Sequence, residues 1–168
     1  MPKFNDFFVE SFGWYELPSD DHVYISMEFF PHGDLGQNLD RSLPEHEGRT
    51  IVSQMLRALE FMHERGFTHR DLKPANVMVA NLGPEWWVKL ADFGISKRTM
   101  TGGTELRSMA GTMHFMAPEI LRLLDDEQET PYAYTDSVDI WSIGVIAYLV
   151  LTKDMPFPAV GDLARYVR

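Results

Sequence analysis

Two short segments near the start of the chain combine β-branched and aromatic residues at a density typical of strands. Residues 7–12 and 23–30 are therefore predicted to be strands, and the polar, proline-containing segment 16–21 between them predicts a turn. We expect the two strands to pair as an antiparallel hairpin. The sequence Pro-His-Gly at 31–33 then ends the second strand.

A helical pattern follows from Asp34 to about Gly66. The second helix of this stretch is expected to start with a capping box at residues 42–45, where a proline occupies the first turn. Apolar residues at helical spacing predict its buried face. They are Ile51, Met55, Leu59 and Met62, with Val52 and Leu56 widening the stripe. Gly66 is a candidate C-cap, and we interpret His63 as structural rather than as a ligand.

Further apolar runs predict the rest of the fold. Residues 77–80 and 86–90 are expected to form a second hairpin, and residues 120–124 to begin a short helix. The run 138–151 is apolar almost all round and predicts a central helix, capped by Thr135 or Asp136. Asp139 lies inside this run, and a buried carboxylate needs a partner. A last helix is expected over residues 162–168.

Composition narrows the class of protein. The chain has 168 residues and is 45% hydrophobic, which suits one domain or most of a larger one. Its net charge of −10 argues against nucleic acid or an anionic membrane as the main partner. The absence of cysteine excludes a disulfide framework and a thiolate zinc site. The sequence shows no secretory signal and no run that could span a membrane. We expect an intracellular protein, cytoplasmic in the first instance, with the nucleus as the alternative.

The sequence His-Arg-Asp-Leu-Lys-Pro-Ala-Asn at 69–76 gathers reactive groups in one polar loop, directly before a predicted strand. Asp71 can accept a proton, Lys73 can hold an anion, and Asn76 can supply a metal-ligating oxygen. The following hairpin is expected to direct Asp92 back toward Asp71. Oxygen donors from two adjacent loops suit Mg²⁺ rather than Zn²⁺.

Taken in order, four motifs resemble those of the eukaryotic protein kinase family. They are the loop at 69–76, Asp-Phe-Gly at 92–94, Ala-Pro-Glu at 117–119 and Asp-Ile-Trp-Ser at 139–142. Lys73 and the Gly-Thr pair at 111–112 resemble the serine/threonine members. The resemblance implies an α+β, protein-kinase-like fold. Residues 1–30 would be a remnant of the small lobe, with its last two strands and hinge, and residues 31–168 a mostly helical large lobe, incomplete at its C-terminus.

The resemblance also implies Mg-ATP-dependent phosphoryl transfer to serine or threonine in protein substrates. Asp71 resembles the catalytic base, and Lys73 resembles the contact to the γ-phosphate. Asn76 and Asp92 resemble the two Mg²⁺ ligands. Thr112 resembles the threonine that bridges the base and the lysine.

For the nucleotide ATP, the resemblance implies a set of binding residues around the second predicted strand and the hinge. Met27 resembles the gatekeeper, and Glu28 to Phe30 resemble the hinge that binds adenine through its backbone. Asp34 resembles the ribose contact. Met78 resembles the apolar floor beneath the adenine.

Other matching positions imply structural and regulatory roles. Arg70 resembles the arginine that pairs with an activation-segment phosphate, for which Thr104 and Ser108 are the expected acceptors. Asp139 resembles the buried aspartate that holds the catalytic-loop backbone. The remaining positions that the motifs imply are His69, Phe93, Gly94 and Glu119.

The chain departs from the family's pattern near its start. It contains no Gly-x-Gly-x-x-Gly loop and no Val-Ala-x-Lys strand, and Lys89 is wrongly placed to substitute for that lysine. Three interpretations stay open: a piece of an active serine/threonine kinase, a catalytically incompetent fragment that acts as an interaction module, and a truncated gene product that does not fold stably. The sequence leaves the oligomeric state and the substrate preference open.

Overall fold

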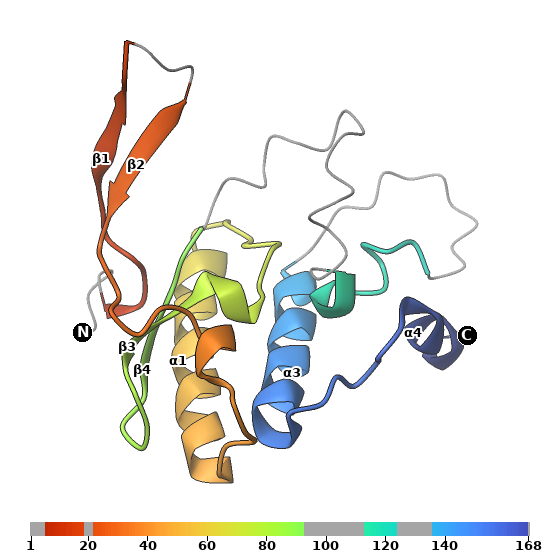
Figure 1. The fold of residues 1–168 in the computed structure, drawn as a ribbon. Helices are drawn as coiled ribbons and strands as arrows, with labels where there is room; N and C mark the ends of the chain where they lie inside the picture. The colour runs from red at the N-terminus through yellow and green to blue at the C-terminus, as the bar shows by residue number, and fades with distance from the viewer. Residues whose placement is uncertain (1–5, 19–21, 93–112, 124–135, 168) are drawn as a thin grey trace.

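In a computed structural model of the chain we describe residues 6–18, 22–92, 113–123 and 136–167. The elements, in chain order, are β1 (Ser11–Glu16), β2 (Val23–Met27), η2 (Gly36–Asn38), α1 (Glu45–His63), η3 (Pro74–Asn76), β3 (Val77–Asn81), β4 (Trp87–Leu90), η4 (Met113–Phe115), α3 (Ser137–Thr152) and α4 (Val160–Tyr166). Within these ranges the strands form two separate hairpins, β1–β2 and β3–β4. The β1–β2 hairpin projects away from the helices, while β3 and β4 lie beside α1 (Figure 1).

The antiparallel pairing of the first hairpin is confirmed, but its first strand lies later in the chain than expected. β1 begins at Ser11, and residues 7–9 run beside β4 instead. The main-chain N–H of Leu90 donates to the carbonyl of Phe7 at 2.8 Å, and the Phe8 side chain is fully buried. The prediction of one strand over residues 7–12 was wrong because Phe8 is buried in the main core, and this takes the segment out of the hairpin.

The helix α1 buries the face that its periodicity predicts. Its four central stripe residues are all 6% exposed or less, namely Ile51, Met55, Leu59 and Met62. Leu56 is 41% exposed, so the stripe is narrower than predicted on that side. The predicted capping box is absent, because α1 begins at Glu45 with Pro44 as its N-cap and no capping side chain. Between Asp34 and α1 the only helical piece is the short turn η2.

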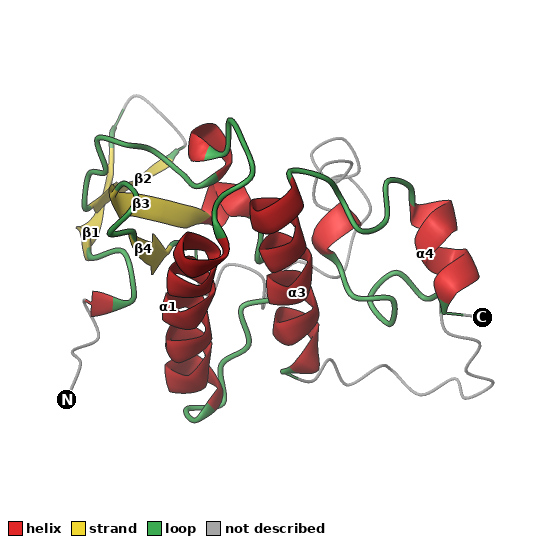
Figure 2. Ribbon diagram, turned by 90° about the horizontal axis from the view of Figure 1, so that it is seen from below, coloured by secondary structure: helices red, strands yellow, loops and turns green. Residues whose placement is uncertain are grey.

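The helices α1 and α3 lie side by side, with the hairpins at one end of the molecule and α4 at the other (Figure 2). Gly48 lies at this contact, where an added Cβ would come within 2.8 Å of Cδ2 of Leu151 and would require that side chain to shift. The prediction of α3 as a core helix is confirmed by Val138, Ile146 and Val150, which are at most 1% exposed. It is not buried all round, since Ile140 is 50% exposed.

Smaller predictions near the C-terminus are corrected. Residues 118–122 form hydrogen-bonded turns rather than the start of a helix. Asp136 is the N-cap residue of α3 without capping through its side chain, which accepts a 2.6 Å hydrogen bond from Thr68 instead. α4 begins at Val160, two residues earlier than predicted. Of the helices described, none is long and apolar enough to cross a membrane.

Candidate active site

The polar loop at 69–76 connects the end of α1 to β3, and the α3 carboxylate of Asp139 holds its first residues. Asp139 is fully buried. It accepts main-chain hydrogen bonds from His69 at Oδ2 and from Arg70 at Oδ1, both at 2.8 Å. Nε2 of His63 also lies 2.8 Å from Asp139 Oδ2, which agrees with a structural role for this histidine. The buried charge therefore has three partners, as its burial requires.

The main chain at Arg70 adopts an uncommon conformation, with φ of 69°. A residue with a side chain is strained in this left-handed region, and such strain persists only where surrounding contacts impose it. The hydrogen bond from the Arg70 N–H to Asp139 is such a contact. The strained turn lies directly before Asp71, so the two features together set the direction in which this carboxylate leaves the chain.

Two side chains of the loop, those of Lys73 and Asn76, donate to the same carboxylate oxygen of Asp71. Lys73 Nζ donates to Asp71 Oδ2 at 2.8 Å, and Asn76 Nδ2 donates to the same oxygen at 3.1 Å. Asn76 Nδ2 also donates to the Asp71 carbonyl at 2.7 Å. Asn76 is buried, whereas the Asp71 and Lys73 side chains are 35% and 27% exposed. The cluster thus has a buried amide at its base and a carboxylate and an ammonium at the surface.

The turn η3 brings the metal candidates onto neighbouring segments. Pro74 occupies the first position of η3, where its fixed φ suits a helical start. The main-chain N–H of Ala91 donates to the carbonyl of Asn76 at 2.9 Å, which brings the end of β4 beside the loop. Asp92 follows with a left-handed φ of 56° and an exposed side chain. Because the Asn76 nitrogen binds Asp71, its side-chain oxygen is left for a cation, and this oxygen-only donor pair fits Mg²⁺.

His69 is completely buried beneath this site. Its Nε2 lies 3.0 Å from the carbonyl of Ala91, and a carbonyl only accepts, so Nε2 carries the proton. Burial lowers the pKa of the His69 imidazole below its ordinary value, against a smaller raising effect of the Asp139 charge. A neutral His69 therefore connects the loop to the segment that carries Asp92.

Three of the predicted nucleotide residues, Phe30, Asp34 and Met78, lie in or beside a small apolar cluster next to this site. Phe30, Val9 and Ala91 are buried together, and Met78 packs against them. The main chain at Asp34 pairs with that at Met78 in a single antiparallel β-bridge. The structure thus brings Phe30, Asp34 and Met78 to one end of the β3–β4 hairpin.

Two other predicted nucleotide residues have different surroundings. Met27 ends β2 with 44% of its surface exposed. Glu28 forms an ion pair with Lys89, a buried lysine of β4. This pair was missed in the sequence, because nothing in the local pattern around Lys89 indicates a partner 61 residues away.

The other predicted positions lie elsewhere or outside the described residues. Glu119 lies in the turn that follows η4, where its carbonyl accepts from the N–H of Arg122 at 3.3 Å. The expected activation-segment and metal-loop positions outside the described ranges are Phe93, Gly94, Thr104, Ser108 and Thr112.

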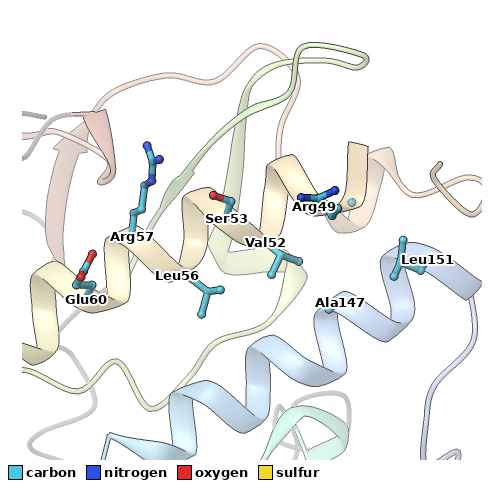
Figure 3. Close-up of a pocket in the computed structure, with 9 residues that line it drawn as sticks. Arg49, Val52, Ser53, Leu56, Arg57, Glu60, Ala147 and Leu151 are labelled. Carbon is cyan, nitrogen blue, oxygen red and sulfur yellow. The ribbon is translucent and has the colours of Figure 1, made fainter. Parts of the chain in front are cut away.

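A shallow apolar groove lies apart from this site, between α1 and α3 (Figure 3). Its volume is about 580 Å³, and Val52, Leu56 and Leu151 supply apolar side chains to it. None of the predicted catalytic or nucleotide residues lines it. The groove is therefore not the reaction site that the sequence predicts.

Comparison with known proteins identifies the family. Residues 4–167 match the model of the protein kinase domain. The chain is 37% identical over 141 residues to the serine/threonine-protein kinase cds1 of Schizosaccharomyces pombe, covering 83% of this chain and 30% of the relative. It is 36% identical over 152 residues to the serine/threonine-protein kinase RAD53 of Saccharomyces cerevisiae, covering 86% of this chain and 18% of the relative.

The fold leads to the same family. A crystal structure of Rad53 1-466 in complex with AMP-PNP matches with a TM-score of 0.70 and 32% identity over 95% of this chain and 38% of that one. The chain belongs to the protein kinase family and carries part of a serine/threonine protein kinase domain. It spans less than a third of the length of the two curated relatives named above. The α+β, protein-kinase-like fold predicted from the motifs is confirmed.

Proposed function

We propose that this chain provides the catalytic loop of a serine/threonine protein kinase, which transfers the γ-phosphoryl group of ATP to a hydroxyl group of a protein substrate. The observation that carries the proposal is the meeting of Lys73 and Asn76 at one carboxylate oxygen of Asp71. The loop that holds them is fixed from below by the buried Asp139. Phosphoryl transfer depends mainly on such positioning and on charge stabilisation.

Each group of the cluster has a task that its chemistry supports. Asp71 accepts the proton of the substrate hydroxyl and orients that hydroxyl toward the phosphorus atom. Lys73 places a positive charge where negative charge moves during the transfer. Asn76 and Asp92 would hold Mg²⁺, and the metal when bound neutralises charge on the nucleotide phosphates. Thr112 is proposed to bridge Asp71 and Lys73.

For the nucleotide, we assign the adenine to the hinge from Glu28 to Phe30, with Met27 as gatekeeper. The apolar cluster around Phe30 supports this assignment, since a planar base needs an apolar floor and Met78 packs there. Asp34 lies where the chain leaves the hinge and is proposed to bind the ribose. The Rad53 structure that matches this chain was determined with AMP-PNP, an ATP analogue, which also supports ATP as cosubstrate.

We propose a regulatory arrangement from the same resemblance. Arg70 would pair with a phosphate on Thr104 or Ser108 and so order the segment that follows Asp92. Phe93 and Gly94 would let Asp92 turn toward the metal. We also propose that residues 1–30 belong to the small lobe of the kinase domain and residues 31–168 to its large lobe.

The test is phosphate transfer from Mg-ATP to a serine- or threonine-containing peptide, measured with labelled ATP for the chain and for Asp71→Asn. Loss of the general base is expected to lower the rate by about 10² to 10⁴. Asp154→Asn, on an exposed loop after α3, is the matched control and should leave the rate unchanged. Equal transfer by the chain and by Asp71→Asn would overturn the proposal.

A second candidate function is a non-catalytic interaction module. These 168 residues contain no Gly-x-Gly-x-x-Gly sequence, and in protein kinases such a loop covers the ATP phosphates, so this part of the nucleotide site has to be supplied before the two candidates can be compared. To separate the two, a glycine-rich loop and a lysine-bearing strand of the kind found in protein kinases are fused before residue 1. Transfer that appears in the fusion and disappears with Asp71→Asn supports the kinase. Partner binding that ignores both Asp71→Asn and nucleotide supports the module.

A further inference from the structure

The buried ion pair between Lys89 and Glu28 has no part in the proposed chemistry. The Lys89 side chain is only 6% exposed, and lysine is almost never buried without a partner. Its Nζ donates to both carboxylate oxygens of Glu28, at 2.8 and 2.9 Å. Glu28 is 30% exposed, so the pair lies at the edge of the interior rather than on the open surface. Water screens the attraction between these two charges less than in an exposed pair, and removal of one partner would leave the other charge partly buried without compensation.

The pair joins two parts of the molecule that are distant in sequence. Glu28 follows β2, whereas Lys89 lies on β4. Glu28 is also connected to the start of the first hairpin, since its N–H donates to the carbonyl of Glu10 at 2.8 Å and its Oε2 accepts from the Glu10 N–H at 3.3 Å. One carboxylate thus ties the base of the β1–β2 hairpin to the β3–β4 hairpin.

The other end of the hinge is held by main-chain bonds. The N–H of Val79 donates to the carbonyl of Gly33 at 2.9 Å, and the N–H of Leu35 donates to the carbonyl of Val77 at 2.7 Å. Figure 1 shows this connection passing from β2 down beside β3 and β4. Within the described ranges, residues 29–32, between the two attachments, form no main-chain hydrogen bond with β3 or β4. Apart from the packing of Phe30 against Val9 and Ala91, their position therefore depends on these two attachments, one of which is the ion pair.

The surroundings of Lys89 show why this attachment uses a charge. The ring centroids of Trp87 and Phe30 lie 5.2 and 5.9 Å from its Nζ, so two aromatic rings lie near the cation. Such rings attract a cation but offer no hydrogen-bond acceptor comparable to a carboxylate. Only Glu28 among the described groups ion-pairs with it. If the hinge moved away from β4, Lys89 would lose the Glu28 carboxylate, and the ion pair therefore opposes that motion.

We propose that Lys89 and Glu28 are positioning residues that set the place of the hinge main chain and thereby the affinity for the adenine base. The inference rests on the proposed function, since it assigns adenine to the hinge. Breaking the pair lets the hinge shift from β4 and weakens the hydrogen bonds between the base and the backbone. We expect the loss of affinity to concern the adenine base and not the phosphates, because neither side chain forms a hydrogen bond or ion pair with residues 69–76 in the described part of the chain.

The experiment measures dissociation constants of ADP, adenosine and tripolyphosphate by calorimetry for the chain, Lys89→Met and Glu28→Gln. Weakening about one hydrogen bond is expected to raise the dissociation constants of ADP and adenosine roughly fivefold. Tripolyphosphate, which has no base, should bind with unchanged affinity. Arg165→Met, which breaks an exposed ion pair at 83% and 41% exposure, is the matched control and should change none of the three.

A second measurement separates positioning from general destabilisation. Hydrogen exchange at the amides of residues 28–30 should accelerate in Glu28→Gln, while exchange within α1 stays the same. The reversed pair Lys89→Glu with Glu28→Lys should restore part of the adenosine affinity that either single change removes. Glu28→Gln is nearly isosteric, so it serves where Lys89→Met does not fold.

The outcomes of the two measurements are distinct. A chain that binds neither ADP nor adenosine overturns the proposed function and, with it, this inference. A chain that binds both, with equal affinity in Glu28→Gln, overturns the inference and leaves the kinase proposal in place. Equal losses for tripolyphosphate and adenosine also overturn it, because they show a general structural defect.

Discussion

Asp139 and His69 are 70 residues apart in the sequence, yet the Asp139 carboxylate accepts a 2.8 Å hydrogen bond from the His69 main-chain N–H. The same carboxylate accepts from the next N–H, at Arg70, also at 2.8 Å. The fully buried carboxylate of Asp139 on α3 therefore fixes the two residues that precede the proposed base, Asp71. Beyond this helix–loop junction, the side chains of Asp71 and Lys73 are partly exposed, whereas Asn76 is buried.

Replacing Asp139 tests this junction. Asp139→Asn removes the charge and offers only one acceptor oxygen to two main-chain donors, so at least one buried N–H loses its partner. We expect the free energy of unfolding to fall by about 2 to 3 kcal/mol in urea titrations. Asp154→Asn, an exposed change, should alter it by less than about 0.5 kcal/mol. Similar values for the two variants would show that Asp139 does not support the loop.

Lys73→Met tests the role of the cation beside Asp71. If Lys73 stabilises charge on the transferring phosphoryl group, its loss should lower the rate of transfer about 10² to 10³ fold. The affinity for ADP, which lacks that group, should hardly change, and calorimetry measures this. Arg57→Met on the exposed side of α1 is the control. A loss of ADP affinity as large as the loss of rate would contradict the assignment.

The pH dependence of stability tests His69. Burial lowers the pKa of its imidazole below the ordinary 6.5, so between the folded and unfolded pKa values the unfolded chain binds more protons. The free energy of unfolding should therefore fall as the pH drops below about 6.5, by up to about 1.4 kcal/mol per pH unit from this group. Stability stays constant with respect to His69 above that pH.

Urea titrations from pH 7.5 to 5.5 measure this slope. His69→Phe should be less stable at pH 7.5, because it loses the bond to Ala91, but its slope should be shallower. His46→Gln, an exposed histidine of α1, should keep the slope of the parent chain. An identical slope in His69→Phe would mean that other groups cause the dependence.

Two leucines of α1 test the extent of its buried face. Leu59 is 1% exposed and Leu56 is 41% exposed. Leu59→Ala leaves a cavity in the core and should cost about 2 to 5 kcal/mol of unfolding free energy. Leu56→Ala should cost less than about 1 kcal/mol, since most of what it removes already contacts water. Comparable losses, measured by thermal or urea unfolding, would show that another element covers the Leu56 side.

Much of the local structure could be predicted from the sequence, because periodicity reflects which residues are buried. The stripe from Ile51 to Met62 and the second hairpin both follow the predicted pattern closely. Where prediction failed, a distant partner decided the outcome. Phe8 is buried in the core rather than paired in the first hairpin. The Asp136 carboxylate accepts a hydrogen bond from Thr68 instead of capping α3.

The candidate site divides in the same way. By itself, the sequence determined the reactive groups, their order and the family, because side-chain chemistry and short spacings are local properties. Only the tertiary structure decided which atoms meet: the two donors at Asp71 Oδ2, the three partners of Asp139, and the pairing of Lys89 with Glu28. The main-chain partners of Asp139 and the pairing of Lys89 with Glu28 join segments more than 60 residues apart, and no local pattern of residues encodes how α3 and β4 pack against those segments. The donors at Asp71 are only 2 and 5 residues away from it, but the loop that brings them together is itself held by Asp139.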